Sequence, residues 1–112
     1  MKRYTESELA SILNLHKAWI IGEDYGKRAN LRRANLREAD LSGADLDYSG
    51  LPLWCGSLSA HFDDKQLKQI AYHLVKAGLQ SKNASDETQA ELRKLIQFAN
   101  GFHRAEKCGF IE

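Results

Sequence analysis

Two cysteines and two histidines are the residues of this chain that could together hold a metal ion. Cys55, His61, His103 and Cys108 supply two thiols and two imidazoles, which is the donor set of a structural zinc site. Zinc ligands usually come as closely spaced C-x-x-C or H-x-x-x-H pairs, whereas these are mixed pairs of one cysteine and one histidine. We therefore expect no metal and no cofactor. Both cysteines are expected to be buried free thiols in a reducing compartment.

The remaining titratable residues with suggestive positions are better explained by packing. His16 and His103 fall within apolar helical stripes, where we interpret each as a hydrogen-bonded core or boundary residue, and His73 as a boundary residue. Asp63 and Asp64 are adjacent acids ahead of a helical pattern. Such a pair usually supplies the helix cap and a partner for the helix dipole, so we do not expect acid–base catalysis there.

Local motifs for catalysis are missing from the sequence. It contains no Gly-rich phosphate loop, no G-x-S-x-G and no H-E-x-x-H. We therefore predict that the protein is not an enzyme.

Charge is the more informative chemical feature. The first half of a central stretch is basic and its second half, with Glu38, Asp40, Asp45 and Asp47, is acidic. The basic residues are the candidate partner-binding residues: Lys27, Arg28, Arg32, Arg33 and Arg37. They could instead form a solvated face with mutual ion pairing, or contact nucleic acid. The formal net charge of only +1 and the lack of aromatic residues among the arginines disfavour nucleic acid.

The same stretch carries an internal repeat of five residues, a period that neither a helix nor a strand has. A small residue, Asn or Asp, Leu and two variable residues recur four times from Ala29 to Tyr48, followed by a degenerate copy. A fixed period indicates a repeat architecture in which each unit buries its apolar face against its neighbours.

This pattern resembles the pentapeptide-repeat family. The resemblance implies a right-handed quadrangular β-solenoid with about four pentapeptides in each square coil, so the chain would form about one coil. Asn30, Asn35, Asp40 and Asp45 would then face outward and brace the corners through Asx hydrogen bonds. The implied inward-facing repeat core is Ala29, Leu31, Ala34, Leu36, Ala39, Leu41, Ala44, Leu46 and Leu51, with Ser49 beside them.

Helical patterns flank the repeat. We predict one domain over residues 1–112 of the α+β class: an N-terminal helix at 5–21, the pentapeptide-repeat coil at 27–53 and a helical hairpin at 62–108, with the helices covering the coil. Thr5 and Glu8 form a capping box for the first helix. Asp63 or Asp64 would cap the second helix, which Gly78 would end. The third would begin near Ser85 or Asp86 and run to Gly109.

A lone coil leaves apolar side chains open at its two ends. Leu53, Trp54 and Leu58 are expected to pack between the coil and the hairpin. Because some apolar surface would remain in so short a chain, we predict a twofold homodimer.

The resemblance sets the functional expectation. It implies a non-enzymatic protein-interaction module of bacterial, phage or prophage type that inhibits a host bacterial protein or defence system. The alternative is a nucleic-acid-binding or topoisomerase-targeting member. Duplex mimicry needs a long acidic rod, and this chain has about one coil whose first half is basic. The N-terminal residues contain no apolar run of signal-peptide or membrane-spanning length, so we expect a cytoplasmic protein without membrane contact.

Overall fold

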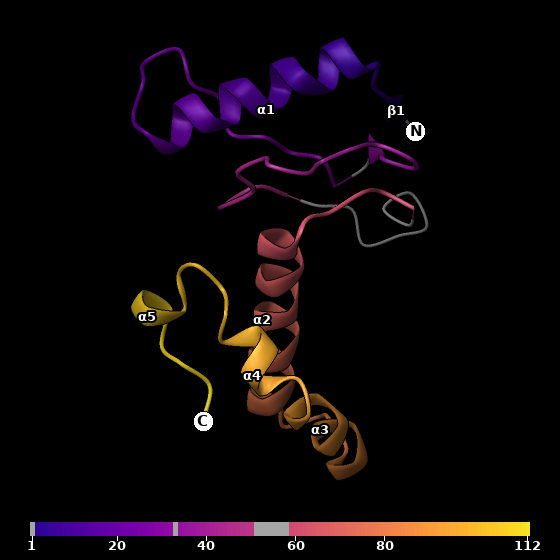
Figure 1. The fold of residues 1–112 in the computed structure, drawn as a ribbon, viewed down its shortest axis with the longest axis vertical. Coiled ribbons are helices and arrows are strands. Elements are labelled where there is room, and N and C mark those ends of the chain that lie inside the picture. The colour runs from indigo at the N-terminus through magenta and orange to yellow at the C-terminus, as the bar shows by residue number, and fades with distance from the viewer. Residues whose placement is uncertain (1, 33, 51–58) are drawn as a thin grey trace. The chain divides into compact units, whose positions relative to one another are not determined.

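The computed structural model describes residues 2–32, 34–50 and 59–112, and the chain divides into two compact units, Met1–Phe62 and Asp63–Glu112. The first unit contains a short strand, a helix and the repeat, and the second is helical (Figure 1). We describe each unit by itself. Whether the two units form the single domain predicted from the sequence stays a prediction.

Helix α1, Glu6–Ile20, begins and ends where its sequence signals lie. The Thr5 hydroxyl accepts a hydrogen bond from the Glu8 amide, and the Glu8 carboxylate accepts one from the Thr5 amide, which completes a capping box. The chain leaves the helix through Gly22, whose φ of 86° is readily adopted only by glycine.

Each described pentapeptide closes a tight turn of the same kind. The amide of the residue three after each repeat leucine donates to that leucine's carbonyl, in the pairs Ala34–Leu31, Ala39–Leu36, Ala44–Leu41 and Ser49–Leu46. The residue before the donor has positive φ in three of these turns, at Glu38, Gly43 and Tyr48. A positive φ at the third turn position is the mark of a type II turn. The period of five therefore appears in the backbone as well as in the sequence.

Parallel pairing brings successive layers of the first unit together. Asn30 bridges Gly50, which is four pentapeptides further along the chain, and Asp40 bridges His61. Strand β1, Lys2–Arg3, pairs in parallel with β2, Ala34–Asn35. The described strands are only these two short ones, together with the two isolated bridges. The right-handed quadrangular coil thus stays a prediction.

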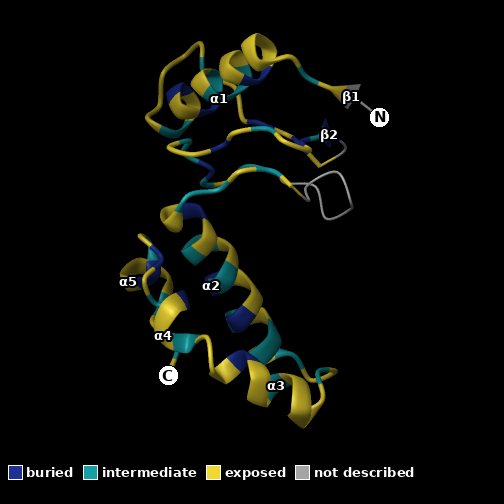
Figure 2. Ribbon diagram, turned by 45° about the vertical axis from the view of Figure 1, so that its right-hand side comes forward, coloured by how far each residue is buried: buried dark blue, intermediate teal, exposed yellow. Residues whose placement is uncertain are grey.

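The core of the first unit lies between α1 and the repeat. Leu9 of α1 is buried against repeat residues, with Tyr4, Ile12 and Leu13 packed around it. The described repeat leucines are all buried, as are the first two repeat alanines: Leu31, Leu36, Leu41, Leu46, Ala29 and Ala34. Ala39 and Ala44 are half-buried, and Leu51 lies outside the described residues, as do Leu53, Trp54 and Leu58. In Figure 2, segments coloured as buried occur in α1 and along the repeat.

The second unit contains four helices instead of the two-helix hairpin predicted from the sequence. They are α2 (Asp64–Gln80), α3 (Asp86–Arg93), α4 (Ile96–Ala99) and α5 (Ala105–Cys108). Asp63 caps α2 in a capping box with Gln66, and Ser85 caps α3. Gly78 was expected to end α2, but the helix runs on to Gln80, and the lack of a Cβ at residue 78 instead makes room for the Leu92 side chain.

The predicted third helix is divided by contacts from distant residues. Asn100 turns its side chain to the C-terminal segment, where its Oδ1 accepts from the Ile111 amide and its Nδ2 donates to the Ile111 carbonyl, both at 2.8 Å. Gly101 follows, and a Cβ there would crowd the Lys68 side chain at 2.9 Å. The chain turns here because these contacts replace a further helical turn.

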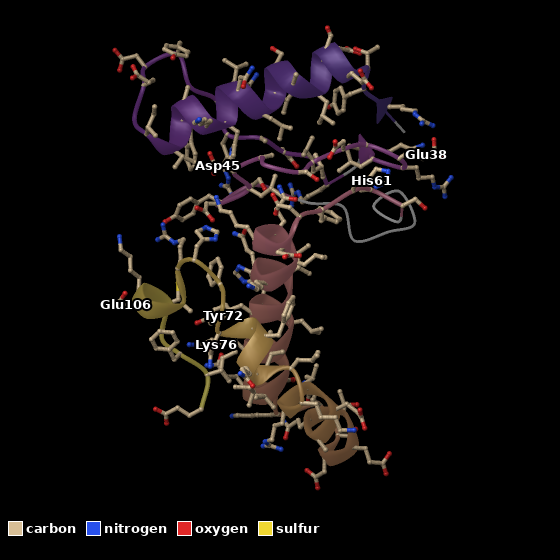
Figure 3. The ribbon with its side chains drawn as sticks, in the orientation of Figure 1. Glu38, Asp45, His61, Tyr72, Lys76 and Glu106 are labelled. Atoms are coloured by element: carbon tan, nitrogen blue, oxygen red, sulfur yellow. The ribbon has the colours of Figure 1, made fainter. Side chains whose placement is uncertain are left out.

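Tyr72 and Lys76 of α2 fix the C-terminal segment of this unit (Figure 3). The Tyr72 hydroxyl donates to the Gly109 carbonyl at 2.7 Å, and the Lys76 ammonium donates to the Cys108 carbonyl at 3.0 Å. A cation near the last carbonyls of a helix is favourable. The core beneath consists of Tyr72, Val75, Ala99, Phe102 and Ala105.

Candidate interaction surface

Three Asx side chains of the repeat accept hydrogen bonds from the backbone of their own pentapeptide. Oδ1 of Asn30, Asn35 and Asp40 accepts the backbone N–H two residues further on, at 3.3, 3.1 and 3.0 Å respectively. These bonds fix the residue that follows each repeat leucine. The side chains at these variable positions, Arg32, Arg37 and Ser42, are exposed. The repeat thus holds outward-pointing side chains on a defined backbone.

The Asp40 brace also perturbs its carboxyl group. The Ser42 amide and then the Ser42 hydroxyl donate to it and hold the pKa of Asp40 below its ordinary value, with the charge of His61 adding to this and desolvation opposing it. Hydrogen bonds to the charged form favour ionisation.

His16 joins α1 to two points of the repeat that are far apart in sequence. The buried Ala29 amide donates to His16 Nδ1 at 2.9 Å, and His16 Nε2 lies 2.6 Å from the Asp47 carbonyl oxygen. An amide always donates, so Nδ1 must be the acceptor and Nε2 must carry the proton. The side chain is fully buried, which agrees with its interpretation as a hydrogen-bonded core residue.

Gly26 lets the chain pass close to α1 before the repeat begins. A Cβ at this position would collide with the backbone of Ala18 and Trp19. The next residue, Lys27, donates its amide to the Leu15 carbonyl at 2.9 Å. The basic residues at the start of the repeat therefore lie directly beside the helix.

Arg28 is held in a partly exposed aromatic cluster. Its Nε donates to the Tyr48 carbonyl, and its Cζ lies 5.9 Å from the centroid of the Trp19 ring. The Trp19 ring also stacks on His16 at 5.8 Å and meets the edge of Tyr48 at 6.0 Å. Trp, Tyr and Arg are the residues that most often dominate binding energy at protein interfaces.

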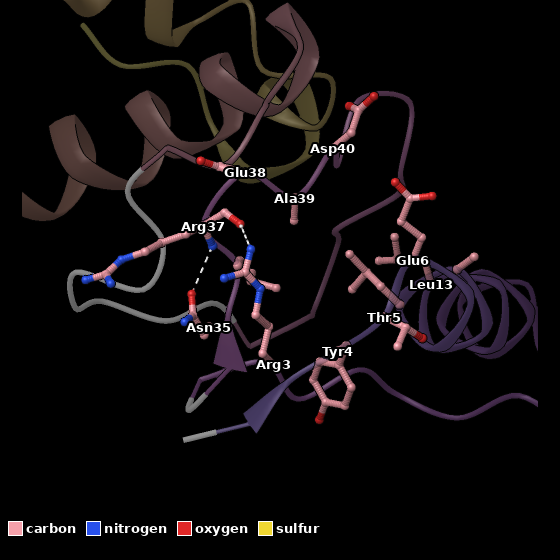
Figure 4. A pocket seen from close by; sticks show the side chains of 13 residues that line it. Arg3, Tyr4, Thr5, Glu6, Leu13, Asn35, Arg37, Glu38, Ala39 and Asp40 are labelled. Carbon is pink, nitrogen blue, oxygen red and sulfur yellow. Dashed lines mark hydrogen bonds between the residues drawn. The ribbon is translucent and has the colours of Figure 1, made fainter.

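Arg37 of the repeat and Arg3 lie beside a separate cavity of about 550 Å³ (Figure 4). Arg3, from β1, points toward Arg37 and donates to its carbonyl at 3.4 Å, while Glu6, Glu38 and Asp40 supply acidic groups to the same lining. Because both signs of charge line this cavity, it does not favour one class of ligand.

The candidate partner-binding residues that the structure describes therefore lie beside different elements of the first unit. Lys27, Arg28, Arg32 and Arg37 are exposed, and Arg33 lies outside the described residues. Lys27 and Arg28 sit against α1, and Arg37 sits beside β1. The sequence analysis missed Arg3, Trp19 and Tyr48, because pairing across the fold brings them to the repeat and no local pattern marks them.

The residues of the zinc donor set are divided between the two units: His61 lies in the first unit, and His103 and Cys108 lie in the second. No group of three or more His, Cys, Asp or Glu residues in the part of the chain that the structure describes could hold a metal ion. His73 and His103 are exposed and lie against the Phe102 ring at 5.7 and 4.9 Å. Cys108 is a free thiol, but it is exposed, so the prediction that it is buried was wrong: it ends the short helix α5 at the surface. Cys55 lies outside the described ranges.

Comparison with known proteins agrees with the repeat. Residues 27–51 match the family model described as pentapeptide repeats (8 copies). No curated protein and no solved structure matches the chain significantly. None of the described helices has the length and apolar character needed to cross a membrane.

Proposed function

Residues 27–51 belong to the pentapeptide-repeat family, and from this we propose that the protein is a non-enzymatic module that binds another protein through the variable positions of the repeat. The observation that carries the proposal is the Asx bracing. Asn30 and Asn35 hold the backbone of Arg32 and Arg37, so that two exposed cationic side chains stand on a fixed framework. Preorganised side chains lose less entropy on binding.

The finer proposal concerns the role of that binding. We propose that the module is a small inhibitor of a bacterial host protein or defence system, of phage or prophage type. This proposal is supported by the resemblance of the repeat to the pentapeptide-repeat family and by the absence of catalytic motifs from the sequence.

Affinity capture from a bacterial lysate, read by mass spectrometry, tests the proposal. The double variant Arg32→Glu, Arg37→Glu should lose the captured protein and keep the thermal stability of the wild type, because both side chains are exposed. The control is the double variant Lys82→Glu, Lys107→Glu, which makes the same change of charge on the helical unit. Equal capture by both variants would remove the repeat arginines from the proposal.

The nucleic-acid alternative gives a different result in the same series. An electrophoretic shift of duplex DNA by the wild type, falling steeply with salt and lost in the Arg32 and Arg37 variant, would replace protein binding as the function of these residues.

A further inference from the structure

A second cavity, of about 330 Å³, opens on the other flank of α1, within the first unit. Its apolar lining comes from the helix, the segment before it and the start of the repeat: Tyr4, Ile12, Leu15 and Ala29. Its polar lining among the described residues is Lys27, Arg28 and Asn30, and none of the described acidic residues lines it. In this it differs from the larger cavity beside Arg37, where charges of both signs meet.

Each polar side chain at this cavity presents hydrogen-bond donors. Oδ1 of Asn30 already accepts the Arg32 amide and the Arg32 Nε, both at 3.3 Å, so the Asn30 amide nitrogen is the group left to donate. The Lys27 ammonium has no hydrogen bond or ion pair with another described residue, and the same holds for the Nη groups of Arg28. Positive charge and unused donors together select an anionic group with several acceptor oxygens.

The Arg28 guanidinium and the backbone at Lys27 are held in place by contacts within the first unit. The Tyr48 carbonyl and the Trp19 ring hold the Arg28 guanidinium, and the bond from the Lys27 amide to the Leu15 carbonyl holds the backbone between them. A site with prearranged donors loses less entropy when it binds.

Volume limits what can enter. Pockets for small molecules usually measure about 300 to 1,000 Å³, so a cavity of about 330 Å³ is at the lower end and takes little more than one large apolar side chain. The three donor residues lie along four consecutive positions, Lys27 to Asn30. Such a row matches successive carboxylates and carbonyls of an extended peptide better than the single carboxylate of a fatty acid.

We propose that this cavity binds an acidic peptide segment of the partner protein, with one apolar side chain seated on Ile12 and Leu15 and its flanking carboxylates on Lys27, Arg28 and Asn30. The inference rests on the proposed function, because it specifies the partner's chemistry for one part of the same surface. It adds α1 to a binding surface that the repeat alone does not complete.

Synthetic peptides test this without knowledge of the partner. The probe is an acetylated and amidated pentapeptide with a central leucine between two pairs of glutamates, titrated into the full chain while the methyl NMR signals of Ile12 and Leu15 are followed. We expect saturable shifts of both signals. Two control peptides should each bind at least about tenfold more weakly than this probe. One has lysines in place of the glutamates, and the other has alanine in place of the leucine.

Lys27→Glu should weaken binding of the glutamate peptide about tenfold or more. Its matched control is Lys17→Glu, the same change at an exposed position of α1 that does not line the cavity. Absence of saturable shifts, equal binding of the lysine peptide, or equal effects of the two variants would overturn the proposal. Decanoate is a further probe: Lys27-dependent binding of decanoate without binding of the peptide would assign the cavity to a lipid-like anion and also overturn it.

The peptide series on the wild type decides the matter even where a variant fails to fold. Failure here is distinct from failure of the proposed function. Capture that depends on Arg32 and Arg37, with no peptide bound beside Leu15, would overturn the cavity proposal alone.

Discussion

Replacing His16 by leucine should destabilise the first unit although it keeps an apolar side chain of similar size in the core. The change removes the acceptor of the buried Ala29 amide and the donor to the Asp47 carbonyl. A buried donor left without a partner costs about 1 to 3 kcal/mol, and loss of an ordinary hydrogen bond costs about 0.5 to 1.5 kcal/mol. Together these give roughly 1.5 to 4.5 kcal/mol in the free energy of unfolding.

Thermal unfolding followed by circular dichroism measures this loss. For a unit of the size of Met1–Phe62, 1 kcal/mol corresponds to about 4 to 8 °C in Tm, so His16→Leu should lower Tm by roughly 6 °C or more. The control is His61→Leu, in the same unit, where the side chain is exposed. Ordinary surface substitutions change the free energy of unfolding by about 0.5 kcal/mol or less. A His16→Leu variant whose free energy of unfolding lies within about 0.5 kcal/mol of wild type would therefore refute the reasoning. So would ¹⁵N NMR evidence that the His16 proton is on Nδ1.

Three further predictions concern the repeat and the assembly. Leu41→Asn should lower the free energy of unfolding by about 3 kcal/mol or more, since it places an amide at a fully buried position. Ser42→Asn, at the exposed neighbouring position, should change stability little. Equal urea midpoints of the two variants would show that the assigned repeat register is wrong. The lowered pKa of Asp40 stabilises the fold above the ordinary carboxyl pKa, and this contribution disappears as the pH falls through the lowered value. The stability advantage of wild type over Asp40→Asn should therefore vanish in acid. An advantage that does not change with pH would contradict this prediction. Light scattering should give twice the chain mass of 12.7 kDa, because α2 exposes an apolar stripe at Leu67, Ile70 and Leu74, and a concentration-independent mass of 12.7 kDa would exclude the dimer.

Features with short-range causes could be read from the sequence. The helix starts at Thr5, Asp63 and Ser85 depend on a side chain and an amide three residues apart, so the pattern and the contact lie in the same few letters. The same is true of the Asx bonds at Asn30 and Asn35, which span two residues.

Features set by distant residues could not be predicted in this way. The end of α4 depends on the bonds between Asn100 and Ile111, eleven residues apart, and the glycine at position 78 makes room for Leu92 of the next helix instead of ending α2. The periodic stripe was real in both cases, but apolar periodicity describes a buried face and does not show whether one helix or several short ones present it. The pairing of β1 with β2 has no local signal at all.

The same distinction applies to the binding surface. Repeat register alone identifies the variable positions, such as Arg32 and Arg37, whose placement is set by Asx bonds within each pentapeptide. It does not identify Arg3, Trp19 or the wall of the cavity beside Leu15, which reach the repeat through β1 and α1. The repeat match spans only residues 27–51, so it offers few variable positions. If partner binding follows the proposed surface, we expect its specificity to depend on helix α1 as much as on the pentapeptides, and variants confined to the repeat would test only part of that surface.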